Sequence, residues 1–140
     1  WVVLGEGDIY PHLGRTVQVV LKGRCVLPPN PGPRSFAPGP FAETPVVDGE
    51  ILSFSTIDCD RVSQAVRQSL WGGQAAKGGE LLGIAVGRVL AHEMYHILGQ
   101  AHRHGREGVG KESLTGAELI AKDFSLAAEE LAIIHQSSRR

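Results

Sequence analysis

The sequence has little of what marks most specialised classes of protein. Its 140 residues include two cysteines and one methionine, and aromatic residues make up only 6%. Fourteen basic and fifteen acidic side chains leave a net charge of -1. The chain therefore lacks the basic excess that sequence-independent binding to nucleic acid or to an anionic membrane requires. We expect neither nucleic acid nor membrane as a partner.

No apolar run is both long enough and free enough of charge to cross a bilayer. The longest, residues 81–98, is interrupted by Arg88, Glu93 and two histidines, whereas a membrane-spanning helix needs about 20 mostly apolar residues. Hydrophobic residues at 42% and charged residues at 21% are typical of a globular domain with one core. We expect a single catalytic domain over residues 1–140.

Cys25 and Cys59 are too few for a four-cysteine zinc site. They either form one disulfide or remain two buried thiols. A disulfide would close a loop of roughly 35 residues, worth about 4 kcal/mol in the chain-entropy model. It would also indicate an oxidising compartment, and hence an extracytoplasmic or secreted location. No leader sequence precedes Trp1, so we expect a processed protein or an excised piece.

The hydrophobic pattern predicts an α+β fold with a small sheet in the N-terminal half. Residues 1–4 and 16–21 are rich in β-branched side chains, and residues 51–57 alternate imperfectly between apolar and polar positions. We expect one strand in each of these segments. Residues 28–49 contain most of the prolines and show neither a helical nor a strand period, which predicts a long surface loop.

The pattern becomes helical after this sheet. Asp58 or Asp60 can cap a backing helix that ends before Gly72. A glycine-rich connection over residues 72–79 then leads to a central helix over residues 81–98. Because this helix is apolar on nearly every face, we expect it in the middle of the domain.

A short helical part is expected at the C-terminus. Thr115 and Glu118 have the spacing of a capping box before an apolar run. Ser125 can cap a last helix. We expect Glu129 and Glu130 on the solvated face of that helix.

The central helix contains the string His92-Glu93-Met94-Tyr95-His96. Residues four apart lie about 40° apart around a helix axis, so the imidazoles of His92 and His96 can point at one ion. Glu93 lies about 100° away from His92, which suits a general base that reaches water on that ion. Unpaired polar groups on so apolar a helix would cost several kcal/mol, so we expect a metal ion as their partner.

A third imidazole follows the helix. Gly99 can take a left-handed conformation, end the helix and reverse the chain, which would bring His102 to the ion. His104 is the alternative third ligand, although the shorter reach from Gly99 favours His102. Three neutral imidazoles leave one zinc position open for water, as in catalytic sites. We expect one catalytic Zn²⁺.

The eleven residues His92-Glu93-x-x-His96-x-x-Gly99-x-x-His102 resemble the extended HExxH zinc-binding motif of the metzincin clan of zincin metallopeptidases. This resemblance implies His92, His96 and His102 as zinc ligands, Glu93 as general base and acid, and Gly99 as the turn. It also implies a zincin-like fold. Analogy with secreted metzincins again favours an extracytoplasmic location.

The chain departs from the metzincin pattern after the motif. Metzincins place a methionine-containing turn beneath the metal, whereas the single methionine here, Met94, lies inside the motif. We expect residues 108–114 to form the floor of the site, with Val109 or Leu114 as its apolar support. Metzincins also align substrate along an edge strand beside the active-site helix, and here a predicted helix and a glycine-rich connection intervene.

The predicted function is peptide-bond hydrolysis by a zinc metalloendopeptidase, through a zinc-bound water activated by Glu93, on a peptide or protein substrate. One alternative is a zinc-binding or scaffold domain without activity, consistent with the missing methionine turn. Another is a metal-dependent endoribonuclease, because a family of ribosome-maturation endonucleases has three histidines at the same spacing. That family has glycine where this chain has Glu93. The sequence predicts neither the native substrate nor the oligomeric state.

Overall fold

The computed structural model describes residues 16–30 and 39–137, which form an α+β arrangement of a small sheet and several helices. The strands are β1 (Gln18–Lys22), β2 (Ala42–Glu43), β3 (Val46–Val47), β4 (Glu50–Ile51) and β5 (Phe54–Asp58). The helices are α1 (Cys59–Ser69), the 3₁₀ helix η1 (Gly72–Lys77), α2 (Gly78–Gly99), α3 (Gly116–Leu119) and α4 (Ala128–Ser137). The strand expected over residues 1–4 lies outside the described residues.

Strand β5 is the middle strand of a three-stranded sheet. It pairs in parallel with β1 and antiparallel with β2, so the strand order is β1-β5-β2. Its side chains alternate, with Ser55 and Ile57 fully buried. The strand expected over residues 16–21 is therefore confirmed as β1, which begins two residues later and ends one residue later, and β2 is an edge strand of the described sheet.

The segments expected as one strand and one loop are divided differently in the structure. Residues 51–57 contribute to both β4 and β5, because β4 pairs with β3 in a separate hairpin. Asp48 and Gly49 form its turn with φ values of 51° and 83°, which suits a tight two-residue connection. The expectation of a loop over residues 28–49 is thus wrong for its second half, which contains β2 and β3, while residues 31–38 lie outside the description.

Helix α1 follows β5 directly and packs mainly against α2 and α3, with a smaller contact to β1. Asp58 is its N-cap, since its carboxylate accepts a hydrogen bond from Arg61 N at 3.0 Å. The first residue of the helix, Cys59, forms a disulfide with Cys25. Of the two states left open for these cysteines, the structure contains the disulfide, which ties the loop after β1 to the start of α1.

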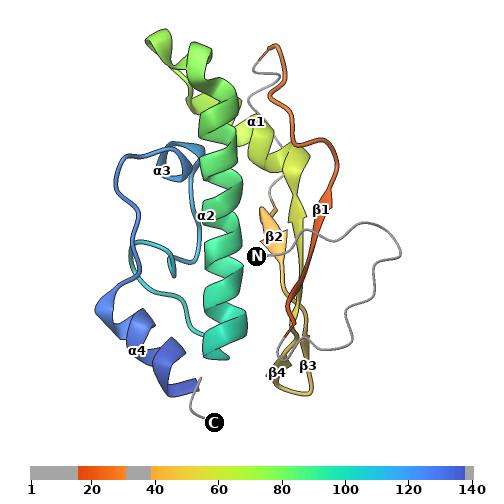
Figure 1. The fold of residues 1–140 in the computed structure, drawn as a ribbon, viewed down its shortest axis with the longest axis vertical. Helices are drawn as coiled ribbons and strands as arrows, with labels where there is room; N and C mark the ends of the chain where they lie inside the picture. The colour runs from red at the N-terminus through yellow and green to blue at the C-terminus, as the bar shows by residue number, and fades with distance from the viewer. Residues whose placement is uncertain (1–15, 31–38, 138–140) are drawn as a thin grey trace.

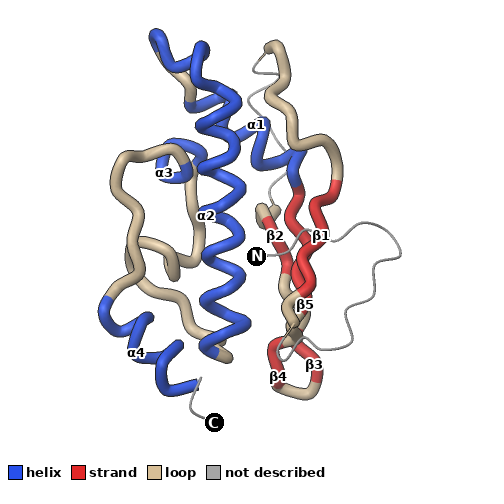
Figure 2. Tube along the Cα trace, viewed as in Figure 1, coloured by secondary structure: helices blue, strands red, loops and turns tan. Residues whose placement is uncertain are grey.

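Helix α2 is the central element. Figure 1 shows it between the sheet on one side and α3 and α4 on the other, and the strands and helices are distinguished in Figure 2. It is longer than expected, and the glycine-rich connection before it is the 3₁₀ helix η1. By length and a mean hydropathy of 1.2 alone, Gly72–Gly99 would qualify as a membrane span, a test that the central helix of a globular domain also passes.

The C-terminal part packs on α2 through two short helices. Thr115 and Glu118 form the expected capping box at α3. The last helix begins later than expected: Ser125 instead accepts a hydrogen bond from Val109 N through its carbonyl oxygen. Two clusters of buried apolar residues fill the interior. The larger lies between the sheet, α1, α2 and α3 (Ile57, Val62, Val66, Leu82, Ala85, Val89 and Leu119), and the smaller near the end of α2 (Tyr95, Ala101 and Val109).

Candidate metal centre

Three imidazoles converge beside the C-terminal half of α2. His92 and His96 lie one turn apart on the helix, and His104 lies on the chain that returns after it. One ring nitrogen from each lies within 4.8 Å of the others. The rings of His92 and His104 are stacked with centroids 5.4 Å apart, and the ring of His96 stands edge-on to both.

Backbone carbonyls orient the two helical histidines. His92 Nδ1 lies 2.7 Å from Val109 O, and His96 Nδ1 lies 2.5 Å from Ala101 O. A carbonyl oxygen can only accept, so each Nδ1 must carry the proton. In the neutral rings both Nε2 atoms are therefore unprotonated acceptors.

These two acceptors face each other, since His92 Nε2 and His96 Nε2 are 3.1 Å apart. Two lone pairs at this distance repel unless a cation or a proton lies between them. Two nitrogens on one tetrahedral zinc ion, each at about 2.0–2.1 Å, would be separated by about 3.3 Å. The donor set, the spacing of the His92 and His96 nitrogens and the hydrogen bonds at Nδ1 thus fit a zinc-type ion.

Electrostatics favour the neutral, ligating form of two of these rings. Burial lowers the pKa of His92 below its ordinary value, although the hydrogen bond to Val109 O acts in the opposite direction. Partial desolvation, followed by the charge of His96, lowers the pKa of His104. Both shifts favour the neutral ring over the charged one, and the neutral ring is the form that binds a metal ion.

The structure brings His104 to this centre, whereas His102 lies outside the group of converging nitrogens, although both side chains are exposed. Of the two candidates for the third ligand, the structure thus places the alternative, His104, with the other two rings. The reason is the position of the turn. Gly99 is still helical, and Gln100 takes the left-handed conformation with φ 47°.

The chain after this turn first enters the protein and then returns to the site. Ala101 is buried, and its carbonyl oxygen is the partner of His96 Nδ1. Tyr95 Oη then donates a hydrogen bond to Arg103 O at 3.2 Å, which fixes the residue before His104. The imidazole that joins those of His92 and His96 is therefore the one of His104, two residues after His102.

Gly99 has a different role from the one expected. A Cβ atom there would lie 3.0 Å from Ile133 Cγ2 on α4 and 3.4 Å from Ala101 Cβ. The glycine therefore permits the close approach of α4 to the end of α2. Gln100 makes the turn instead, and its side chain forms hydrogen bonds with Ile51 in the β3–β4 hairpin.

Glu93 lies one residue after His92 and is buried, with 6% of its surface exposed. Its Oε2 atom accepts a hydrogen bond from Thr44 Oγ1 at 2.5 Å. Thr44 directly follows β2, so the carboxylate is attached to the edge strand of the sheet. No described strand pairs with the outer edge of β2.

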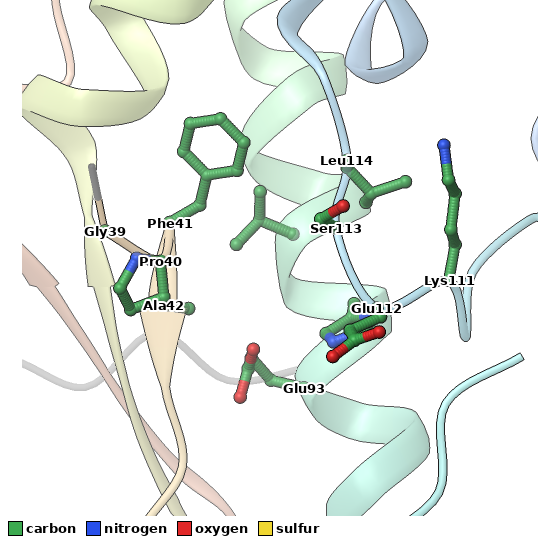
Figure 3. Close-up of a pocket in the computed structure, with 11 residues that line it drawn as sticks. Gly39, Pro40, Phe41, Ala42, Glu93, Lys111, Glu112, Ser113 and Leu114 are labelled. Atoms are coloured by element: carbon green, nitrogen blue, oxygen red, sulfur yellow. The ribbon is translucent and has the colours of Figure 1, made fainter. Parts of the chain in front are cut away.

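A pocket of about 190 Å³ opens beside Glu93. Figure 3 shows Glu93 at one end, Phe41 and Ala42 on the side of β2, and Ser113 and Leu114 on the opposite side. Cofactor pockets usually enclose about 300–1,000 Å³. This pocket has room for one side chain of medium size, and Phe41 and Leu114 make its walls largely apolar.

Val109 and Leu114, the residues expected to support the floor of the site, lie in two different positions. Val109 is 4% exposed and supports His92 through its carbonyl oxygen, and Leu114 lines the pocket.

The sequence prediction missed Thr44, because it lies in a segment interpreted as a loop. It also placed Glu130 on a solvated face, whereas Glu130 is 3% exposed. A capping-type spacing from Ala127 to Glu130 was the available signal for the latter.

Comparison with protein-family models, with curated proteins and with solved structures gave no match. The function of the three histidines therefore has to be inferred from their own geometry and chemistry.

Proposed function

We propose that this chain is a zinc-dependent metallopeptidase of zincin-like, metzincin-like fold, in which His92, His96 and His104 hold the metal and Glu93 is the general base. The observation that carries the proposal is the convergence of three imidazoles, two of them oriented by backbone carbonyls, next to a buried carboxylate that lines a pocket. A structural zinc site would use four protein ligands, whereas three leave a position open for catalysis.

A zinc ion bound there would supply Lewis acidity, which polarises a peptide carbonyl and makes water easier to deprotonate. Glu93 accepts the proton from the attacking water and delivers it to the departing amine nitrogen. Thr44 holds one oxygen of that carboxylate through its hydroxyl group. The Nδ1 hydrogen bonds of His92 and His96 keep both rings turned toward the metal position.

The surroundings of Glu93 support a peptide as the substrate. An extended peptide can add to the outer edge of β2 through main-chain hydrogen bonds, and β2 lies directly before Thr44. The adjoining pocket would take an apolar side chain, since Phe41, Val89 and Leu114 line it. The Cys25–Cys59 disulfide supports an extracytoplasmic or secreted location for this activity.

The test is digestion of a peptide library by the zinc-loaded chain, with cleavage sites identified by mass spectrometry. Glu93→Gln should keep its zinc and lose at least about 100-fold in rate, the usual contribution of general base catalysis. Glu80→Gln is the matched control, because Glu80 lies exposed in the first turn of the same helix. It should cleave like wild type.

Two outcomes would contradict the proposal. Equal rates for Glu93→Gln and wild type would exclude Glu93 as the base. A wild-type chain that binds zinc but cleaves no peptide would instead support a zinc-binding domain without activity, and RNA cleavage in a parallel assay would support the endoribonuclease alternative.

A further inference from the structure

Glu130 is a buried carboxylate that the proposed reaction does not use. It lies in the first turn of α4 and is 3% exposed, while its neighbour Glu129 is exposed. Burying a carboxylate is unfavourable unless hydrogen-bond donors replace its water. The groups that donate hydrogen bonds to this carboxylate therefore indicate which parts of the structure it holds together.

The two carboxylate oxygens have separate partners. Oε2 accepts a hydrogen bond from Ala127 N at 2.8 Å, which caps α4. Oε1 accepts one from Gly110 N at 3.1 Å, across 20 residues of sequence. Capping of α4 needs only the first bond, so the second has another consequence.

Two glycines make room for this carboxylate. A Cβ atom on Gly110 would lie 2.1 Å from Glu130 Oε1, and one on Gly105 would lie 2.6 Å from the same atom. These glycines also bond to each other, since Gly105 N donates to Gly110 O at 2.6 Å. The carboxylate therefore lies against two chain segments that are joined beside it.

Each of these segments contains a part of the candidate metal centre. Gly105 directly follows His104, and Gly110 directly follows Val109, whose carbonyl oxygen accepts the hydrogen bond from His92 Nδ1. One buried carboxylate thus contacts the neighbours of a ligand and of the group that orients another ligand. Neither of its two hydrogen bonds is made to an imidazole.

We propose that Glu130 is a positioning residue of the metal centre, which holds His104 and the carbonyl partner of His92 in place from α4. This inference rests on the metal site of the proposed function. Groups that orient metal ligands typically affect metal affinity by about 10- to 100-fold when they are changed. A role in capping alone would change stability and leave the affinity of the folded chain unaltered.

The experiment measures Co²⁺ and Zn²⁺ affinity of the folded chain, with the visible Co²⁺ spectrum as a report on the ligand geometry. Glu130→Gln keeps the shape but loses one of the two accepting oxygens, and should weaken affinity by about 10- to 100-fold. Glu129→Gln is the matched control and should stay within about twofold of wild type. Val66→Ala removes volume from the distant core, so it lowers stability without weakening metal binding.

A second measurement does not involve metal. In the metal-free chain, the Gly110 amide should exchange its hydrogen faster in Glu130→Met than in Glu129→Met, because methionine leaves this amide without an oxygen acceptor. Should Glu130→Gln fail to fold, Gly110→Ala is the second variant, since its methyl group would displace the carboxylate. It should weaken affinity in the same way.

Folded Glu130→Gln with wild-type affinity and an unchanged Co²⁺ spectrum would overturn the inference. An equal loss of affinity in Val66→Ala would do the same, because it would reduce the effect to stability. A wild-type chain that takes up neither ion would contradict the proposed function instead. In that case unchanged exchange at Gly110 would separately show that Glu130 does not hold this loop.

Discussion

Thr44 Oγ1 donates a hydrogen bond of 2.5 Å to Glu93 Oε2, and so joins the residue after edge strand β2 to the candidate base on α2. The two residues are 49 positions apart in the sequence. Because Glu93 is buried, this donor replaces water that the carboxylate would otherwise bind. A displacement of β2 would therefore shift or break this hydrogen bond to the carboxylate.

Replacing Thr44 by Val keeps the shape of the side chain and removes the donor. We expect kcat for peptide cleavage to fall about tenfold, equivalent to about 1.4 kcal/mol of transition-state stabilisation, with zinc content unchanged. Thr44→Ser retains the hydroxyl group and should restore most of kcat. Steady-state kinetics of the three chains provide the comparison, and equal kcat in Thr44→Val and wild type would show that the hydrogen bond does not position the base.

Gln100 fastens the β3–β4 hairpin to the end of α2. Ile51 N donates to its Oε1 at 3.1 Å, and its Nε2 donates to Ile51 O at 2.9 Å, as a neighbouring strand would. Gln100→Ala leaves both backbone groups of buried Ile51 without partners, so the free energy of unfolding should fall by about 1–3 kcal/mol. Denaturant unfolding measures this.

Exposed Gln136 on α4 offers the control for that prediction, and Gln136→Ala should change stability by less than about 0.5 kcal/mol. The Gln100 prediction is wrong if both substitutions have the same effect. A third substitution, Gln100→Gly, separates two contributions. It also loses the amide, but it relieves the left-handed backbone and should be more stable than Gln100→Ala.

Glu118 makes the stability of the fold depend on pH. Its partner Lys111 lines the pocket beside Glu93. Hydrogen bonds from Lys111, then from the backbone and hydroxyl groups of Thr115, lower the pKa of Glu118 from 4.5 to about 2. A lowered pKa in the folded state means that the contribution is complete above the unfolded value and is lost as the pH falls toward 2. The stability difference between wild type and Glu118→Gln should therefore be present at pH 7 and shrink between pH 5 and pH 2.

Thermal unfolding of both chains across this pH range checks the prediction. Glu129→Gln, whose side chain is exposed, should show no such convergence with wild type. Part of the effect comes from the ion pair with Lys111, so added salt should reduce the difference at pH 7. A difference that stays constant down to pH 2 would contradict the role given to the ionised carboxylate.

Local signals in the sequence were enough to predict the helices that hold the site. The Asp58 cap, the Thr115–Glu118 capping box and the four-residue spacing of His92 and His96 act within one or two helical turns. Such short-range interactions are decided by neighbouring residues, so the pattern of residues reveals them.

The parts that the sequence did not reveal depend on contacts between distant segments. The choice of His104 over His102 follows from burial of Ala101 and from the left-handed turn at Gln100, which glycine would normally be expected to make. Thr44 lies in a proline-rich segment whose edge strand forms only by pairing with β5. Burial of Glu130 depends in turn on two glycines that leave space for it.

Separate measurement of zinc affinity in His104→Ala and His102→Ala tests the central claim most directly. The two residues lie in the same short segment, so each variant serves as the control for the other. We predict that His104→Ala loses at least about 100-fold in affinity, while His102→Ala binds zinc like wild type. Wild-type affinity in His104→Ala, or a comparable loss in His102→Ala, would contradict a metal centre built from His92, His96 and His104.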